Sequence, residues 1–366
     1  MSITSTCFWD YMGRVGLSWV VNPSVPPLHE DDENVLFIGN SYTGYNRLPK
    51  LVQAALEEAR KSEPASSSSI VKATRKVNVA SHTPPGETFV GHRKALENGH
   101  LFRRFSFDFY YLGNHLQRCL IPGKDHAATT ITATAAADAG DNVQQRQWNW
   151  ITLQNHSIQA GFFASSDPKI KSIFNESLEA AKAINNIIVE HHVNAKTIFV
   201  LTWGRPGKHQ GYPDLYPSFL TMQQLLLEGC QKYVEATSAP ARPTYLAPVG
   251  LVFRTIYQDC CGSINANAGG GGEHSDVDDT TNDPTRPPSL FYDLYDKGDH
   301  HPSLAGSYVY ALTVVATMTG KNVVRDLNAW VPIGLDAEVA KKLREAVQRT
   351  IEQTVREKII RYPWQD

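Results

Sequence analysis

The sequence predicts an α/β fold, a three-layer α/β/α sandwich with a mostly parallel central sheet. Short β-branched or aromatic runs recur along the chain, and several are apolar throughout, as strands covered on both faces of a sheet must be. Segments with apolar residues at helical spacing lie between these runs. Strands that alternate with helices favour parallel pairing through right-handed crossovers, which is the basis of the prediction.

The expected strands and helices can be placed by residue number. The strands are predicted over 35–39, 76–81, 107–113, 150–154, 197–203 and 244–250, and amphipathic helices over 48–59, 170–188 and 339–355. In such a sheet the ligand crevice lies beyond the carboxyl ends of the strands. Residues that directly follow a strand are therefore the first candidates for a site.

Length and composition indicate one elaborated domain. The chain has 366 residues, of which 42% are hydrophobic and 20% are charged. We expect this domain over 34–325, after an N-terminal extension over 1–33, with a C-terminal helical segment over 326–366 packed on it. A stretch near 261–288 is rich in Gly, Asp, Asn, Thr and Pro, which predicts a low-complexity insertion.

Charge and hydropathy exclude several classes of partner. The formal net charge is −2 and no dense Lys/Arg run occurs, so nucleic acid is not an expected partner. Nothing approaches about 20 consecutive apolar residues, so no membrane span is expected. The N-terminus shows no clear signal peptide, and the five cysteines have no metal-ligand spacing. These features favour a cytoplasmic location.

A serine follows the first expected strand in the sequence FIGNSYT. Gly39 can form a tight turn there, and the next helix would direct backbone N–H groups toward whatever the Ser41 hydroxyl attacks. Asn and Ser are also ordinary turn and N-cap residues, so this motif needs a base to acquire a catalytic meaning.

The candidate base lies near the other end of the chain, in DKGDHHPSLAGSY. Here His300 and His301 directly precede Pro302 and a helix of small residues, which would hold His301 at a helix N-terminus. A serine hydroxyl needs such a base to attack at neutral pH, and histidine is the side chain best suited to serve.

FIGNSYT and HHPSLAGSY together resemble the first and last sequence blocks of the SGNH/GDSL hydrolases, esterases in which the nucleophilic serine comes early and an Asp-x-x-His segment comes late. The segment TPPGETFVGH (83–92) is similar to the second block, and WNWITLQNHSIQ (148–159) occupies the place of the third. LTWGRPG (201–207) is similar to a subgroup with uncharacterised substrates. The resemblance covers about 35–321 and implies a flavodoxin-like SGNH hydrolase fold.

The resemblance also implies how an oxyanion would be bound. The N–H of Ser41 or of its neighbour and the N–H of Gly86, in the second block, would donate to it. The third block usually reads Gly-x-Asn-Asp and supplies an asparagine amide, but here the strand ends in LQNHS. Either Gln154 or Asn155 would then supply the side-chain donor.

A second departure concerns the carboxylate that orients the histidine. Gly298 stands three residues before His301, where the family pattern has Asp. Asp299 is the first candidate and Asp296 the second, and a Ser–His pair oriented by a backbone carbonyl is a third alternative. The Asp-His-His cluster would also suit a metal, although three ligands from one tight loop would need a fourth from elsewhere.

Four further residues are expected to line the substrate cleft. Asn40 and Tyr42 flank Ser41, while Trp203 and Arg205 end another strand, where Arg205 would bind a polar or anionic substrate group. The alternative is a packed Trp203 and a solvated Arg205.

The function predicted from these residues is hydrolysis of a short acyl or acetyl ester through an acyl-enzyme on Ser41, with no cofactor or metal. The substrate would be a small-molecule ester or a carbohydrate ester. An acyltransferase that uses the same residues, and a non-catalytic binding protein on the same fold, are the alternatives.

Overall fold

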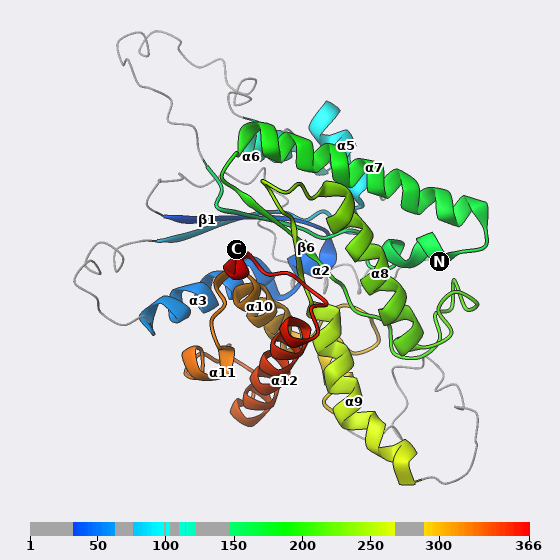
Figure 1. Ribbon diagram of the computed structural model, residues 1–366, viewed down its shortest axis with the longest axis vertical. Helices are drawn as coiled ribbons and strands as arrows, with labels where there is room; N and C mark the ends of the chain where they lie inside the picture. The colour runs from blue at the N-terminus through cyan, green and yellow to red at the C-terminus, as the bar shows by residue number, and fades with distance from the viewer. Residues whose placement is uncertain are drawn as a thin grey trace.

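The computed structural model describes residues 32–62, 76–98, 100–102, 110–113, 115–121, 147–267 and 289–366. Its five-stranded central sheet lies between two layers of helices, and all of the strands in this sheet are parallel (Figure 1). The predicted fold class is confirmed. In spatial order the strands are β2 (Val77–His82), β1 (Glu33–Ile38), β5 (Trp150–Leu153), β6 (Lys196–Val200) and β7 (Tyr245–Ala247).

The strand order places a crevice next to β1. From β1 the chain moves to β2 on one side, then returns to β5 on the other side and continues through β6 and β7. This is the doubly wound order of the flavodoxin-like folds, in which ligands bind where the direction of winding reverses. The loops that follow β1 and β5 therefore flank the expected crevice.

The helices form one layer on each face of the sheet. One layer contains α5 (Phe89–Asn98), α7 (Pro168–His191) and α8 (Phe219–Thr237), and the other α3 (Leu48–Lys61), α9 (Val249–Asn267), α10 (Leu304–Thr319) and α12 (Ala337–Arg356) (Figure 1). The shorter helices are α2 (Ser41–Gly44), α6 (His115–Leu120), α11 (Val323–Asp326), η2 (Tyr45–Arg47), η3 (Gln159–Ala164), η4 (Tyr292–Leu294) and η5 (Pro363–Gln365).

Helix α10 is buried along nearly its whole length, because α3, α9 and α12 all pack against it. A helix that is apolar on every side is stable only in such a position. Its N-cap is Ser303, whose hydroxyl accepts the N–H of Gly306, and the N–H of Ser303 donates to Leu294 O at 2.9 Å. The loop before α10, which carries both candidate histidines, is therefore fixed to the core.

One expected strand does not join the central sheet. Within the predicted strand 107–113, β4 (Tyr110–Gly113) pairs antiparallel with β3 (His100–Phe102) in a separate two-stranded sheet, and 103–109 lie outside the described residues. Aromatic and β-branched composition predicts extended structure but not the partner with which it pairs.

The domain boundaries stay predictions. Residues 1–31 and 268–288, most of the predicted extension and insertion, lie outside the described residues. Helix α9 continues to Asn267, so the first seven residues of the predicted insertion, 261–267, are helical. In the C-terminal segment, α12 packs against α9 and α10. Among the described helices, none has the length and apolar character needed to cross a bilayer.

Candidate active site

Ser41 lies at the tip of a tight turn between β1 and α2. Asn40 is the N-cap of α2, and its side-chain oxygen accepts the N–H of Tyr42 at 3.1 Å. A Cβ atom on Gly39 would lie 2.7 Å from Thr43 Oγ1 and 2.9 Å from Gln154 Oε1, so only glycine fits at this point of the turn. The turn raises the Ser41 hydroxyl above the end of β1, as the sequence predicts.

The neighbouring strand holds this turn in place. Gln154, at the end of β5, accepts the N–H of Asn40 at 3.1 Å and the hydroxyl of Thr43 at 3.0 Å. Thr43 in turn contacts the hydroxyl of Tyr310 on α10 at 3.1 Å. Because all these groups are buried and hydrogen-bonded, the position of Ser41 is determined by the core and not by a free loop.

Ser41, His301 and Asp299 form a continuous line of hydrogen bonds. Ser41 Oγ lies 2.8 Å from His301 Nε2, and His301 Nδ1 lies 2.5 Å from Asp299 Oδ2. The imidazole of His301 stacks on the ring of Tyr45, with centroids 4.7 Å apart, and meets the ring of Tyr42 at its edge. The structure thus joins the two ends of the sequence in the arrangement of a nucleophile, a base and an orienting carboxylate.

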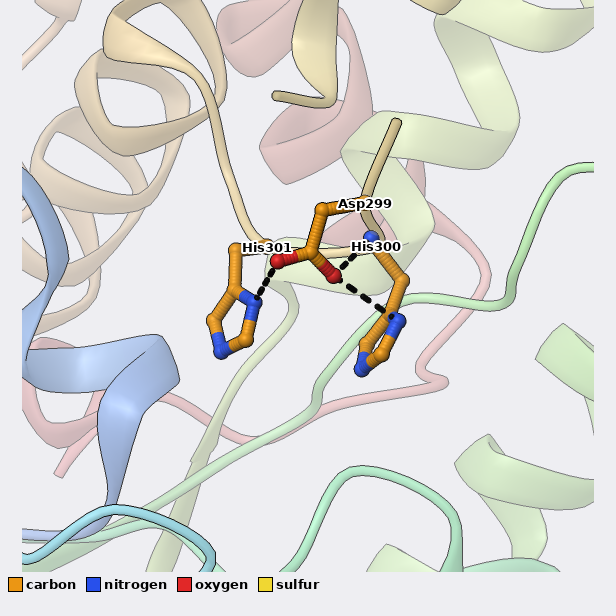
Figure 2. A group of neighbouring side chains, drawn as sticks. All are labelled: Asp299, His300 and His301. Carbon is orange, nitrogen blue, oxygen red and sulfur yellow. Dashed lines mark hydrogen bonds and ion pairs between the residues drawn. The ribbon is translucent and has the colours of Figure 1, made fainter. Parts of the chain in front are cut away.

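The carboxylate of Asp299 accepts hydrogen bonds on both oxygens. Oδ2 faces His301, and Oδ1 accepts the backbone N–H of His300 at 2.6 Å and lies 3.0 Å from His300 Nδ1 (Figure 2). Burial acts to raise the pKa of Asp299, but the hydrogen bond from His301 and the nearby imidazoles outweigh it and hold the pKa well below its usual range. Asp299 is therefore anionic at neutral pH.

Of the two candidate aspartates, Asp299 places its carboxylate against the imidazole of His301. Asp296 accepts the hydroxyl of Tyr45 at 3.0 Å instead, and its backbone N–H donates to His301 O at 2.9 Å. A spacing of two residues therefore suffices for the contact. Gly298, with a φ of 77°, lies in the turn directly before Asp299 that the bond from Asp299 N to Asp296 O closes. Asp296 supports the ring on which His301 stacks.

Of the two predicted side-chain donors to an oxyanion, Asn155 does not fit this geometry, and the role of Gln154 stays a prediction. Asn155 donates both of its amide hydrogens inside the protein, to Ser177 Oγ at 2.7 Å and to Tyr233 OH at 3.0 Å. Gln154 is completely buried, and its amide nitrogen donates to the carbonyl of Asn155. Asn155 therefore has no amide hydrogen left for a substrate, whereas the Gln154 amide nitrogen carries a second hydrogen.

Two backbone N–H groups stay available as oxyanion donors. Within the part of the chain that the structure describes, the N–H groups of Ser41 and Gly86 donate to no protein acceptor. Gly86, with a φ of 67°, occupies the third position of a turn closed by Glu87 N and Pro84 O. Asn40 Nδ2 donates to Glu87 O at 3.0 Å, which ties this turn to that of Ser41. The oxyanion role of Gly86 stays a prediction.

Three of the predicted cleft residues lie beneath the site and not in its wall. Trp203 is fully buried, between the rings of Tyr42 at 4.8 Å and Phe253 at 4.7 Å. Tyr42 and Asn40 are each 3% exposed. The cleft assignment for these residues is wrong because the apolar rings complete the core under the loops, and Asn40 uses its side chain to cap α2.

Arg205 is partly exposed and contacts His300, for which the sequence predicted no part in the ester chemistry. Arg205 Nη2 donates to His300 Nε2 at 3.4 Å, so the His300 proton lies on Nδ1 and points at Asp299. Burial, followed by the charge of Arg205, lowers the pKa of His300 to about 3. Neutral His300 therefore links Arg205 to the carboxylate. In the sequence, the two adjacent histidines directly after Asp299 were the signal that could have indicated a role for His300.

Asp299, His300 and His301 also meet a geometric criterion for a metal site, since one ligand atom from each lies within 4.8 Å of the others. Figure 2 shows both imidazoles turned toward the carboxylate of Asp299. Two ligands of a tetrahedral zinc ion lie about 3.3 Å apart. The 2.5 Å contact between His301 and Asp299 is a direct hydrogen bond and leaves no room for an ion between them.

Buried histidines predict that the fold loses stability in mild acid. Burial lowers the pKa of His115, His156, His192 and His209 to about 4. The unfolded chain takes up these protons near pH 6.5, so it binds more protons than the folded chain between pH 6.5 and 4, and stability falls as the pH falls through this window. We expect the Tm to drop by about 5 °C or more. Calorimetry across this pH range measures the drop in Tm, and a constant Tm would contradict the prediction.

Comparisons with known proteins bear on the fold. No family model and no curated protein matches the sequence. Among solved structures, the chain is similar to a DUF4886 family protein from Bacteroides uniformis, with 15% identity, a TM-score of 0.55 and coverage of 88% of this chain and 95% of that one. The two proteins share a fold.

Two further solved structures are less similar. A gut microbial diltiazem-metabolizing enzyme has 11% identity and a TM-score of 0.43, and the match covers 80% of this chain and 48% of that one. An acetyl xylan esterase from Geobacillus stearothermophilus has 13% identity and a TM-score of 0.37, with 77% and 93% covered.

Proposed function

We propose that the protein is a serine ester hydrolase of the SGNH/GDSL type. The observation that carries this proposal is the line of hydrogen bonds from Ser41 Oγ through His301 to Asp299, with contacts of 2.8 and 2.5 Å. A serine, a histidine and a partly buried carboxylate in this order activate a hydroxyl for attack on a carbonyl carbon. The shared resemblance of the sequence blocks around Ser41 and His301 supports the same assignment.

The first step forms an acyl-enzyme. Asp299 holds the His301 proton on Nδ1, so that Nε2 is free to accept the proton of Ser41 as its oxygen attacks the ester carbonyl. The negative charge that develops on the carbonyl oxygen is stabilised by the N–H groups of Ser41 and Gly86. Each such donor is worth about 10²–10³ in rate. Protonated His301 then gives its proton to the leaving alcohol.

The second step hydrolyses the acyl-enzyme. Neutral His301 removes a proton from a water molecule, which attacks the acyl carbonyl, and the same proton returns to Ser41 as the acid leaves. In both steps the anionic Asp299 stabilises the imidazolium form of His301. An alcohol in place of water would make the same residues an acyltransferase.

A short acyl group suits the surroundings of the nucleophile. Ser41 is only 7% exposed, and the stacked rings of Tyr45 and His301 lie beside it. We propose acetyl and other short acyl esters as substrates, with esters of carbohydrates as the first natural class to screen.

The test is hydrolysis of 4-nitrophenyl acetate and butyrate by the purified protein, together with labelling by a fluorophosphonate, which reacts with activated serines. We expect turnover of the acetate and labelling of Ser41. If a folded protein gives neither, a non-catalytic binding protein is favoured. Adding an alcohol acceptor to the assay separates transfer from hydrolysis.

Removal of divalent metals should leave this activity unchanged. The proposed steps use only Ser41, His301, Asp299 and backbone N–H groups. We therefore expect the same kcat/KM after dialysis against EDTA as before. Loss of activity that added Zn²⁺ restores would instead assign the Asp299, His300 and His301 group to a metal.

A further inference from the structure

We propose that Arg205, His156 and His209 form a subsite next to Ser41 that binds a carboxylate group of the ester substrate. This inference rests on the proposed function, because it names the class of ester that the same site would take. The other assigned residues account for bond cleavage and leave these three side chains without a role.

The sheet topology places two of these residues close to Ser41. Ser41 follows β1, His156 follows β5, and Arg205 follows β6, and these three strands are neighbours in the sheet. Parallel strands end at the same edge, so the three loops lie side by side. The stacking of Tyr42 on Trp203 brings the end of β6 directly to the turn of Ser41.

Among the described residues, no carboxylate forms an ion pair with the positively charged Arg205. The guanidinium donates to the neutral imidazole of His300 at 3.4 Å and lies beside the hydroxyl of Tyr42. Its Nε atom is buried without a hydrogen-bond partner. A partly buried guanidinium in this state is stabilised by an anion that takes up its free N–H groups.

The loop around Arg205 is held rigidly. Gly204, the residue before it, donates its N–H to Gln223 Oε1 at 2.9 Å and accepts the hydroxyl of Tyr295 at 2.8 Å. Trp203 Nε1 donates to His300 O at 3.3 Å. The guanidinium is therefore attached to a preorganised support, as a binding residue requires.

Within the described residues, His209 has a buried N–H donor without an acceptor. Its Nδ1 accepts the backbone N–H groups of Gly211 at 3.0 Å and Tyr212 at 3.1 Å. A ring nitrogen that accepts two hydrogen bonds carries no proton, so the proton of the neutral ring lies on Nε2. His209 is 5% exposed, and Nε2 has no partner. A ligand oxygen would satisfy it.

His156 completes the group. In the described part of the chain its Nδ1 is buried without a partner, and the residue lies in the loop that follows β5, next to the loop of Arg205 after β6. Burial, followed by the charge of Arg205, lowers the pKa of both His156 and His209 to about 4. At neutral pH the subsite therefore holds one positive charge and neutral polar rings, which match a carboxylate with its single negative charge.

Matched ester pairs test the inference. In one pair the acyl group carries the charge, with mono-4-nitrophenyl succinate against 4-nitrophenyl pentanoate; in the other the alcohol carries it, with 4-acetoxybenzoate against its methyl ester. We expect the wild-type protein to prefer the carboxylate member of one pair by about tenfold or more in kcat/KM. Equal rates within both pairs would overturn the inference and leave the proposed esterase in place.

The variant Arg205→Gln shows whether Arg205 causes the preference. Because Arg205 also contacts His300, the readout is the ratio of the two kcat/KM values within a pair, which a general loss of catalysis does not change. We expect this ratio to fall to about one. Arg325→Gln, which changes an arginine on the surface of α11, is the matched control and should keep the wild-type ratio. A preference that persists in Arg205→Gln would refute the assignment.

A binding measurement separates the two proposals. Ser41→Ala should bind 4-acetoxybenzoate more tightly than its methyl ester by calorimetry, and Arg205→Gln in the same background should abolish the difference. If the wild-type protein hydrolyses no ester but this difference is seen, the subsite stands and the esterase proposal fails. If neither compound binds and the wild-type protein hydrolyses neither these compounds nor 4-nitrophenyl acetate, both proposals fail.

Discussion

Replacing Ser41 by alanine is expected to abolish ester hydrolysis and fluorophosphonate labelling. The hydroxyl is the only group of the site able to form the acyl-enzyme, and its hydrogen bond to His301 Nε2 at 2.8 Å shows no competing role. Removal of the nucleophile in hydrolases of this design lowers kcat by about 10⁶, down to the rate that binding and oxyanion stabilisation provide. Steady-state kinetics with 4-nitrophenyl acetate and gel-based labelling measure both effects.

The control for Ser41→Ala is Ser172→Ala, which removes a hydroxyl from the exposed surface of α7. This variant should keep full activity and labelling. Ser41→Ala should also retain the wild-type Tm within a few degrees, because it deletes a single oxygen at a site where no apolar packing is lost. Hydrolysis at the wild-type rate in a folded Ser41→Ala protein would contradict the assignment of the nucleophile.

The sequence allowed prediction of Ser41 and His301 because each depends on local structure. A glycine turn directly after a buried strand and a Pro-Ser start of a helix are properties of a few adjacent residues. The alternation of strands and helices then places the ends of β1 and β5 at one edge, which limits where a site can lie. The fold class and the nucleophile and base candidates therefore came from short-range patterns.

The roles of Gln154, Asn155 and Trp203 could not be predicted in the same way. Each follows a strand, and their residue types suit a cleft equally well as a core. Whether each of these side chains lines a cleft or packs in the core depends on residues far away in the sequence. Tyr233 on α8 takes up the Asn155 amide, Phe253 on α9 covers Trp203, and the turn of Ser41 occupies Gln154. Only the packed structure supplies these partners.

Replacing Asp299 by asparagine is expected to lower kcat by about 10⁴ while the protein stays folded. The reason lies in the two oxygens of the carboxylate. Oδ1 faces two donors of His300, its backbone N–H and Nδ1–H, so the single oxygen of an asparagine would turn toward them. The amide NH₂ group would then face His301 Nδ1, which must become an acceptor. The His301 proton would move to Nε2, and this nitrogen would no longer accept the proton of Ser41.

Asp296→Asn is the matched comparison, because Asp296 lies in the same loop but accepts the hydroxyl of Tyr45. Asparagine can still accept that hydrogen bond, so we expect kcat to fall by less than about tenfold. Thermal unfolding of both variants controls for loop integrity. Equal large losses would mean that the loop geometry, and not the Asp299 charge, limits catalysis. If kcat falls only slightly in Asp299→Asn, Ser41 and His301 work as a pair without a carboxylate. The rate would then not depend on the His301 tautomer that Asp299 selects.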